Sequence, residues 1–223
     1  MSRFRNSAGR YTCTRGTRLQ RERILHSLEG KVALVTGGTG GIGLAVARNF
    51  VVAGARVTIT GRRPEGEETA AKIGARFDRC DATIETEVAR CIEFAAAQDG
   101  NIDVLVVNAG VALDEGSIES LSASDMQSIM DVNLRGVFLA LKHGPRHMSD
   151  GGSIITTGSV AGSGTTNAGS AIYSASKAGV AYLSRTSAIE LAPRGIRCNT
   201  VCPAVIAGTG MMVADDGNEE AAF

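Results

Sequence analysis

The sequence lacks the features that would point to a membrane protein or a metalloprotein. No uninterrupted apolar run reaches the ~20 residues that a membrane-spanning helix needs, so no membrane partner is expected. The three histidines are scattered and the cysteines show no CxxC spacing, which argues against a metal site. Reduced, mostly buried thiols in a cytosol-like compartment are the better interpretation of the five cysteines: Cys13, Cys80, Cys91, Cys198 and Cys202.

The chain also lacks a net charge, although its charges are unevenly divided. Residues 1–28 carry seven arginines and a single acid, Glu22, which gives a net charge of +6. The remainder carries 16 basic and 22 acidic side chains, a net charge of −6. An acidic body gives no reason to propose nucleic acid as a partner.

The 223 residues are enough for one sizeable domain, and the composition changes at its start. Residues 1–27 are rich in arginine, serine and threonine, which predicts a basic, unstructured leader. The same composition is compatible with an organellar transit peptide, so we expect a cytoplasmic protein with organellar import as the alternative. A domain over residues 28–212 and a short tail over residues 213–223 would complete the chain.

Patterns typical of strands and helices alternate along this domain. Continuous runs of valine and isoleucine indicate strands that are covered on both faces. Strands and helices in alternation predict an α/β fold with a doubly wound parallel sheet of the Rossmann type. The expected strands are 31–37, 55–60, 75–80, 102–110, 152–159 and 196–202, and the expected helices are roughly 41–53, 83–98, 122–147 and 171–192.

A glycine-rich turn, TGGTGGIG at 36–43, follows the first strand and opens the first helix. Glycines at such a turn let the backbone approach a pyrophosphate and aim helix N-terminal N–H groups at its charge. Gly38, Gly40 and Gly43 fit GxGxxG, which is a weak signal alone and also describes a tight turn that binds nothing. Its place in the first βα unit of an alternating domain favours a dinucleotide site.

The end of the second strand indicates which dinucleotide is expected. A carboxylate at this position would bind the ribose hydroxyls of NAD, but the sequence here is TGRRPEG. Arg62 and Arg63 instead suit a 2′-phosphate, so NADP(H) is favoured over NAD(H). The alternative is an ordinary exposed basic turn.

The segment AIYSASKAG at 171–179 places Tyr173 and Lys177 on one face of a helix. A nearby ammonium stabilises a phenolate and so makes a phenol a better acid–base catalyst near neutral pH. The neighbouring residues are small, which would let a flat cofactor lie close to the helix. Taken alone, the spacing Tyr-x-x-x-Lys is more often a surface pair.

The chain has a family likeness that rests on three features together: TGGTGGIG, the YxxxK pair, and Ser159, which lies fourteen residues before Tyr173. The sequence resembles the short-chain dehydrogenase/reductase family, in its single-domain subtype, over about residues 28–212. The resemblance implies that Tyr173 protonates a carbonyl oxygen and that Lys177 promotes this step and holds the nicotinamide ribose. It also implies a substrate hydrogen bond from Ser159, and a helix kink and an ordered relay water at Asn133.

The same resemblance assigns the cofactor contacts. Asp81, in RCDAT, matches the position that contacts adenine, and Asn108 to Gly110 match the turn after the fourth strand. Ile206, with Thr209 near it, matches the nicotinamide side. The expected cofactor-binding residues are Gly37, Thr39, Gly41, Ile42, Gly43, Arg62, Arg63, Asp81, Asn108, Gly110, Tyr173, Lys177 and Ile206.

Three departures from the family pattern stand out. Val107 replaces the first asparagine of NNAG, and Ala204 replaces the glycine of Pro-Gly after the sixth strand. A glycine can adopt backbone angles that alanine resists, so a reshaped loop is expected there. Only 21 residues follow Cys202, so we expect six strands without the usual final strand, an exposed edge at 196–202 and an incomplete substrate lid.

Two functions follow from these patterns. The first is an oxidoreductase that transfers a hydride between NADP(H) and a ketone, an aldehyde or a secondary alcohol. The second is a truncated, non-catalytic relative that binds a dinucleotide but cannot close over a substrate. The partner is a small molecule in the first case, and a homo-oligomer is expected to be weakened by the short C-terminal segment. The sequence does not name the substrate.

Overall fold

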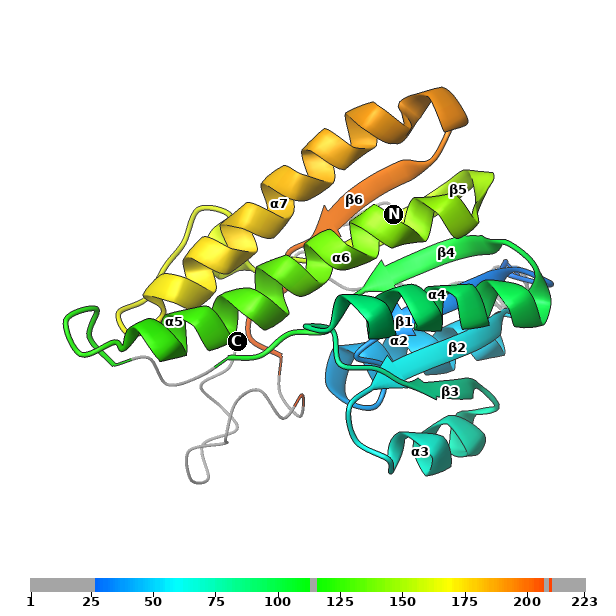
Figure 1. The fold of residues 1–223 in the computed structure, drawn as a ribbon, viewed down its shortest axis with the longest axis horizontal. Coiled ribbons are helices and arrows are strands. Elements are labelled where there is room, and N and C mark those ends of the chain that lie inside the picture. Colours follow the sequence, from blue (N-terminus) through cyan, green and yellow to red (C-terminus); the bar gives the residue numbers. More distant parts are fainter. Residues whose placement is uncertain (1–26, 113–115, 207–208, 210–223) are drawn as a thin grey trace, which may run out of the picture.

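The computed structural model describes residues 27–112, 116–206 and 209. Six strands form one parallel sheet in the order β3-β2-β1-β4-β5-β6 (Figure 1), which confirms the predicted Rossmann-type fold. Apart from Ser27, the predicted leader lies outside the described residues, and so do Cys13 and the predicted tail at 213–223. The strands are β1 (Val32–Thr36), β2 (Arg56–Gly61), β3 (Arg76–Arg79), β4 (Ile102–Val107), β5 (Met148–Thr157) and β6 (Arg197–Val201).

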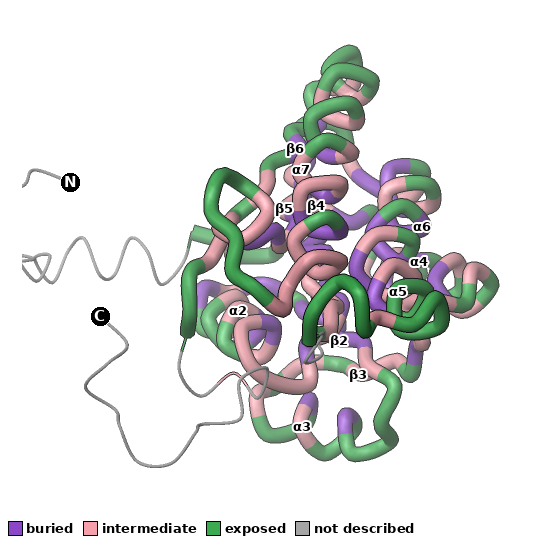
Figure 2. Tube along the Cα trace, turned by 90° about the vertical axis from the view of Figure 1, so that its left-hand side faces the viewer, coloured by how far each residue is buried: buried purple, intermediate pink, exposed green. Residues whose placement is uncertain are grey.

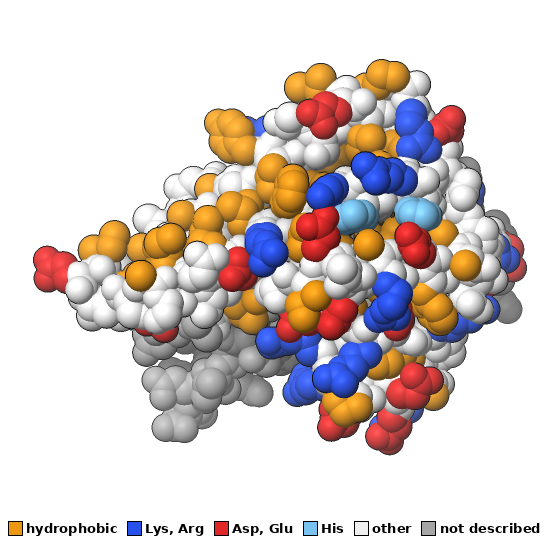
Figure 3. Space-filling view, viewed as in Figure 1, with side chains coloured by type: hydrophobic (Ala, Val, Ile, Leu, Met, Phe, Trp, Pro, Cys, Tyr) orange, Lys and Arg blue, Asp and Glu red, His pale blue; other side chains and the backbone are white. Residues whose placement is uncertain are grey.

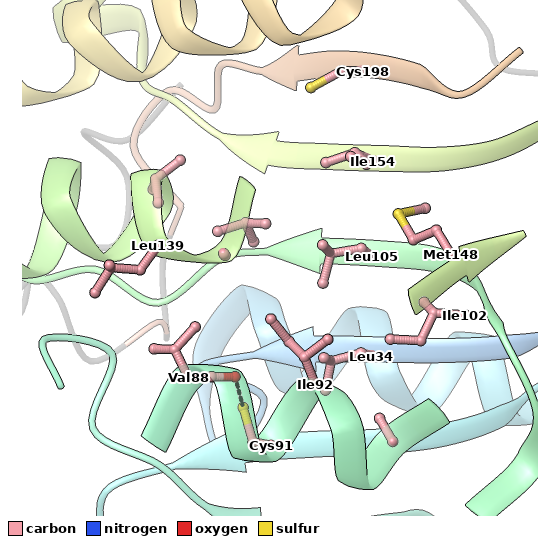
Figure 4. Packing of buried hydrophobic residues seen from close by; sticks show 14 of the residues in the cluster. Leu34, Val88, Cys91, Ile92, Ile102, Leu105, Leu139, Met148, Ile154 and Cys198 are labelled. Carbon is pink, nitrogen blue, oxygen red and sulfur yellow. Dashed lines mark hydrogen bonds between the residues drawn. The ribbon is translucent and has the colours of Figure 1, made fainter. Parts of the chain in front are cut away.

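Helices cover the two faces of the sheet, and alternation along β1 shows how each face is packed. Val32 and Leu34 belong to one hydrophobic cluster, together with residues of α4 (Glu85–Asp99), α6 (Gly136–His143) and α7 (Ala171–Leu191). Ala33 and Val35 belong to a second cluster, with residues of α2 (Gly41–Val52) and α3 (Gly66–Ile73). The buried residues therefore follow the strands and the helix sides that face them (Figure 2). Figure 4 shows part of the first cluster, between the central strands and α4 and α6.

The sequence pattern missed helix α3, which connects β2 to β3. The signals are present, since Glu67 and Glu68 lie in its first turn and Lys72 in its last, where they complement the helix dipole. Gly74 ends the helix in the left-handed conformation, at φ 74°. The helix has only eight residues, which is why its periodicity was too brief to stand out.

The single helix expected over 122–147 is in fact a series of shorter segments. Ser122 caps α5 (Ala123–Met130) through a capping box with Asp125. A turn of π-helix at Asp131–Arg135 then separates α5 from α6, and a 3-10 turn at Gly144–His147 follows α6. The π-helical turn contains Asn133, the residue at which the family resemblance implies a kink.

Strand β6 lies at one edge of the sheet, as predicted, and pairs with β5 within the described residues. Its two faces are not equally buried. Cys198 is buried against the α7 side, whereas Arg197, Asn199 and Val201 are exposed. The alternation is visible in RCNTV itself, which is not a continuous run of valine and isoleucine.

The four described cysteines are free thiols. Cys80, Cys91 and Cys198 are buried free thiols and Cys202 is half-buried, in line with the reduced cysteines that were predicted. No helix in the described ranges is long and apolar enough to cross a membrane.

Hydrophobic side chains gather on the outer surface of α5, α6 and α7 (Figure 3), where Phe138 and Tyr182 are exposed.

Candidate active site

A cleft of about 820 Å³ opens at the carboxyl ends of β1, β4 and β5. The strand order changes direction between β1 and β4, and doubly wound proteins bind their ligands at this kind of position. One end of the cleft, here called the arginine end, contains Arg62, Arg63 and Asp81. The other, here called the lysine end, contains Ser159, Tyr173 and Lys177.

The glycine turn between β1 and α2 forms the middle of the cleft and is closely packed. A Cβ atom on Gly43 would lie 2.2 Å from the carbonyl oxygen of Gly37, so only glycine fits at this position. Gly37 has φ 64°, a conformation that favours glycine. The first turn of α2 holds no acidic residue and its N-cap, Gly40, has no side chain, so this turn itself presents no negative side chain to an anion.

At the arginine end, a glycine takes the place where an acid would bind a ribose. A Cβ atom on Gly61 would lie 2.8 Å from Cγ2 of Thr39 and 2.9 Å from its Oγ1, so Thr39 occupies the space an acidic side chain would need. Arg62 and Arg63 are exposed beside this contact. Arg79 donates a hydrogen bond of 3.0 Å from Nε to the carbonyl oxygen of Arg62 and so fixes the backbone of the arginine pair.

Asp81 follows β3 and lines the arginine end. Partial burial alone would raise the pKa of its carboxyl group, but two hydrogen bonds from Thr83 and the charge of Arg62 lower this pKa on balance. The hydrogen bonds run to Oδ1 from the backbone N–H and the hydroxyl of Thr83, at 2.9 and 2.8 Å. Asp81 is therefore held as an ionised hydrogen-bond acceptor near neutral pH.

The lysine end is built around a buried ammonium group. Lys177 is only 2% exposed, and its Nζ donates a hydrogen bond of 2.9 Å to the carbonyl oxygen of Thr157. Nζ lies 5.8 Å from the centre of the Tyr173 ring, so helix α7 brings the two side chains together. Burial lowers the pKa of Lys177 to about 8, and the nearby Cys202 acts in the opposite direction.

Ser159 completes this end of the cleft from the segment that follows β5. Its side chain is buried, and Oγ accepts a hydrogen bond of 3.2 Å from the backbone N–H of Ala161. This bond caps a short 3-10 turn at Val160–Gly162. Gly162 packs against α7, where a Cβ atom would lie 2.5 Å from the nitrogen of Ala178, so the turn that carries Ser159 is fixed against the helix that carries Tyr173 and Lys177.

Asn133 is fully buried behind the cleft and does not line it. Its Oδ1 accepts a hydrogen bond from the N–H of Val111 at 2.7 Å, and its Nδ2 donates to the carbonyl oxygen of Val111 at 2.8 Å. Nδ2 also donates to Oγ of Ser176 at 3.2 Å, and this hydroxyl donates to the carbonyl oxygen of Tyr173. The carboxamide therefore joins the loop after β4 to helix α7, and a solvent-facing Asn133 is excluded.

Nearly all of the predicted site residues lie along this one cleft. The exceptions are Asn133 and Gly43, which support the residues that line it. The predicted residues that line the cleft are Gly37, Thr39, Gly41, Ile42, Arg62, Arg63, Asp81, Asn108, Gly110, Ser159, Tyr173, Lys177 and Ile206.

Sequence reasoning missed two supporting residues. Thr157 accepts the hydrogen bond of Lys177, and Ser176 bonds both Asn133 and Tyr173. Ser176 had a signal, since it lies within the Tyr-x-x-x-Lys segment, whereas nothing local marks Thr157 among the polar residues of TTGS.

Ala204, which replaces the family glycine, has a backbone conformation that suits a residue with a side chain. Among the described residues no side-chain-bearing residue has a positive φ, so Ala204 adopts an ordinary conformation next to Pro203. The carbonyl oxygen of Pro203 accepts a hydrogen bond of 3.0 Å from Val160, which ties this segment to the turn after Ser159. The segment also reaches the glycine turn, where a Cβ atom on Gly41 would lie 2.8 Å from the carbonyl oxygen of Thr209.

Comparison with known proteins gives a consistent family. Residues 31–220 match the family model described as short chain dehydrogenase. Zerumbone synthase from Zingiber zerumbet is 39% identical over 184 residues, which cover 79% of this chain and 68% of that protein. A protein from Lavandula x intermedia named "Borneol dehydrogenase, mitochondrial" is 40% identical over 198 residues, 86% of this chain and 75% of its own.

Solved structures agree with the sequence comparison. A dehydrogenase/reductase from Sinorhizobium meliloti superposes with a TM-score of 0.81 at 35% identity, over 89% of this chain and 81% of that one. A short-chain dehydrogenase from Burkholderia cenocepacia, solved in complex with NADP, superposes with a TM-score of 0.74 at 37% identity, over 79% and 74% of the two chains. The chain therefore belongs to the short-chain dehydrogenase/reductase family and is an oxidoreductase of that family.

Proposed function

We propose that this protein is an NADP(H)-dependent oxidoreductase that interconverts a ketone or aldehyde and the corresponding alcohol. The observation that carries the proposal is the lysine end of the cleft. A buried ammonium lies 5.8 Å from the ring of Tyr173, and Ser159 lines the same cavity. The non-catalytic alternative gives no reason to keep a cation buried beside a phenol, because burying a charge costs free energy.

The described residues fit a dinucleotide along the cleft. A pyrophosphate can approach the backbone of the glycine turn closely, because the packing there requires residues without side chains and the first turn of α2 holds no acid. The two ends of the cleft then receive the adenosine and the nicotinamide, with Asp81 on the adenine side and Lys177 on the nicotinamide ribose. When bound, the nicotinamide supplies the hydride that reduces the carbonyl carbon.

The chain's own residues handle the proton. In carbonyl reduction the Tyr173 hydroxyl donates its proton to the carbonyl oxygen, and Ser159 Oγ donates a hydrogen bond to the same oxygen. The ammonium of Lys177 lies 5.8 Å from the centre of the Tyr173 ring, so its positive charge favours the phenolate that Tyr173 becomes. Asn133 fixes the loop at Val111 and joins it to α7 from behind the cleft, and the relay water that the family resemblance assigns to Asn133 would return a proton to Tyr173. Oxidation of an alcohol follows the same steps in reverse.

We assign the cofactor preference to the arginine end. Gly61 leaves no carboxylate for the ribose hydroxyls of NAD, and Thr39 fills the space beside it. Arg62 and Arg63 present two cations at the position of a 2′-phosphate. The Burkholderia cenocepacia structure in complex with NADP supports the choice.

Cyclic secondary alcohols are the first substrates to test. One relative is named for borneol, and another, from Sinomonas cyclohexanicum, is named cis-4-hydroxycyclohexanecarboxylate dehydrogenase and is 41% identical over 181 residues. A panel should pair each cyclic alcohol with its ketone and include linear alcohols of equal carbon number. Turnover limited to the linear compounds would overturn this choice of substrate class.

The test of the proposed function is a fluorescence titration of the full chain with NADPH and with NADH, followed by turnover assays on the panel. We expect NADPH to bind more tightly than NADH and to be consumed with a ketone. Tighter binding of NADH would overturn the cofactor preference alone. Binding without turnover on any member would favour the non-catalytic relative.

Location in the cell depends on residues 1–27. We propose a cytoplasmic protein, and the word "mitochondrial" in the name of the Lavandula relative makes organellar import the alternative to exclude. Fusion of residues 1–27 to a fluorescent protein separates the two. Fluorescence that coincides with an organelle marker would overturn the cytoplasmic assignment.

A further inference from the structure

Strand β5 ends in two consecutive threonines that face opposite sides of the sheet, as neighbours on a strand do. Thr156 is fully buried on the α7 side. Thr157 lines the cleft and is half-buried. The mechanism proposed above gives Thr157 no role, although it makes polar contacts with two separate parts of the site.

The backbone of Thr157 serves the lysine end. Its carbonyl oxygen accepts the hydrogen bond from Nζ of Lys177 at 2.9 Å. Since the acceptor is a backbone atom at the end of a strand, its position is set by the sheet and not by a mobile side chain. This contact fixes where the ammonium lies.

The side chain of Thr157 serves the glycine turn. Its hydroxyl donates a hydrogen bond of 3.2 Å to Oδ1 of Asn108, at the end of β4. Asn108 then donates a hydrogen bond of 3.2 Å from Nδ2 to the carbonyl oxygen of Gly37. A carboxamide has one oxygen and one nitrogen, so a donor on the β5 side turns the nitrogen toward Gly37.

The position of Gly37 matters because the turn has little free space. A Cβ atom on Gly37 would lie 2.8 Å from Cα of Ala109, and one on Gly43 would lie 2.6 Å from Nδ2 of Asn108 itself. Asn108 is thus wedged between the glycine turn and β5. A carboxamide that rotates away from Gly37 would leave a carbonyl without its donor in the middle of the cofactor cleft.

We propose that Thr157 is a positioning residue that sets the glycine turn and Lys177 relative to each other, through its hydroxyl and its carbonyl respectively. The inference rests on the proposed function, because it assumes that a dinucleotide spans the two places. Thr157 does not touch the reacting atoms and is not a catalytic residue. Its hydroxyl acts on cofactor affinity, and its carbonyl acts on Lys177.

The hydroxyl can be tested separately from the carbonyl. Thr157→Val removes the hydroxyl, keeps the β-branched shape that suits a strand, and leaves the backbone carbonyl for Lys177. We expect it to weaken the binding of NADPH and of NADH by similar factors of about 2 to 10, the range for one lost hydrogen bond. The KM for cofactor should rise while kcat stays close to wild type. Thr157→Ser, which restores a hydroxyl, should restore the affinity.

The adjacent residue provides a matched control. Thr156→Val makes the same chemical change one position away, where the hydroxyl contacts Oγ of Ser184 at 2.7 Å and Oγ1 of Thr200 at 2.9 Å, away from the cleft. We expect Thr156→Val to lower the melting temperature and to leave cofactor affinity unchanged. A purely structural role for Thr157 would give the same result in both variants, and that outcome would overturn the proposal.

A double-mutant cycle tests the route through Asn108. Asn108→Ala should weaken cofactor binding, and adding Thr157→Val to it should weaken binding no further. If the two factors multiply, Thr157 does not act through Asn108 and the inference is wrong. Should Thr157→Val fail to fold, Thr157→Ala, which removes the same hydroxyl, must give the same loss. Wild-type protein that binds neither cofactor would overturn the proposed function first, whereas unchanged affinity in Thr157→Val would overturn this inference alone.

Discussion

The two ends of the cleft hold cations in opposite environments. At the arginine end, Arg62 and Arg63 are exposed to water. At the lysine end, Lys177 is 2% exposed and donates a hydrogen bond to the carbonyl oxygen of Thr157. The exposed arginines cost the fold little, whereas burial of the lysine lowers its pKa to about 8.

This difference in exposure indicates which task each end of the cleft can perform. A buried charge is poorly screened by water, and the proposed mechanism uses Lys177 in this way to promote the proton transfer by Tyr173. A charge in water is screened by salt and contributes little to stability, but it can still distinguish two ligands that differ by a phosphate. Changes at the lysine end should therefore alter rate and stability, and changes at the arginine end should alter cofactor choice.

The largest effect is expected from removal of the Tyr173 hydroxyl. Tyr173→Phe should lower kcat by about 10²- to 10⁴-fold, the usual contribution of a positioned proton donor, while NADPH still binds. Steady-state assays and a fluorescence titration measure the two quantities. Tyr182→Phe is the matched control, because Tyr182 lies on the same helix with 68% of its surface exposed, on the outer side of the molecule. Unchanged turnover in Tyr173→Phe would overturn the proposed mechanism and the distinction between the two ends of the cleft.

The second effect is expected from replacement of Lys177, which should change turnover and stability in opposite directions. Lys177→Met should slow turnover yet raise the free energy of unfolding near pH 7. The pKa of Lys177 is lowered from its ordinary value of 10.5 to about 8, which corresponds to about 3 kcal/mol of destabilisation when the lysine is protonated. Denaturant unfolding at several pH values measures the difference.

The pH dependence provides the sign check. The unfolded chain binds more protons than the folded chain between pH 8 and 10.5, so the stability of the wild type rises across this interval. The advantage of Lys177→Met should therefore be full below pH 8 and shrink as the pH approaches 10.5. A variant that is less stable than wild type at pH 7 would mean that the hydrogen bond to Thr157 outweighs the cost of burial. The contrast between the two ends would then lose its energetic basis.

The sequence predicted the fold and most of the cleft because their signals are local. The glycine turn, the Tyr-x-x-x-Lys spacing and the arginine pair are each contiguous, and alternation of strands and helices brings their elements to one edge of the sheet. Helix α3 was missed because eight residues give too few turns for a periodic pattern.

The supporting contacts were harder to predict because their partners are distant in sequence. Asn133 taken alone resembles a solvent-facing residue, and its burial depends on the loop at Val111, 22 positions away, and on Ser176, 43 positions away. The small residues beside Tyr173 were interpreted as space for a cofactor. In the structure, Ser176 instead bonds Asn133, and a Cβ atom on Gly179 would lie 2.9 Å from Cδ1 of Leu134, so protein packing alone requires these two to be small.

The smallest effect is expected at the arginine end, and it should be selective. The double substitution Arg62→Ala and Arg63→Ala should weaken NADPH binding by about 10-fold, as expected for lost contacts between exposed cations and a phosphate, and should leave NADH binding and the melting temperature unchanged. Arg48→Ala is the control, since Arg48 is exposed on α2 and does not line the cleft.

Salt sharpens this last test. Exposed charges are screened within about 8 Å at physiological ionic strength, so the preference of the wild type for NADPH should shrink as salt is added, while the preference of the double variant, already small, should stay constant. Equal losses for NADPH and NADH would show that the arginines hold the adenosine end in general and do not read the phosphate. Arg79 bonds the backbone carbonyl of Arg62 and not its side chain, so this contact survives in the double variant. The loop should therefore keep its shape, and the substitutions should change only the charge.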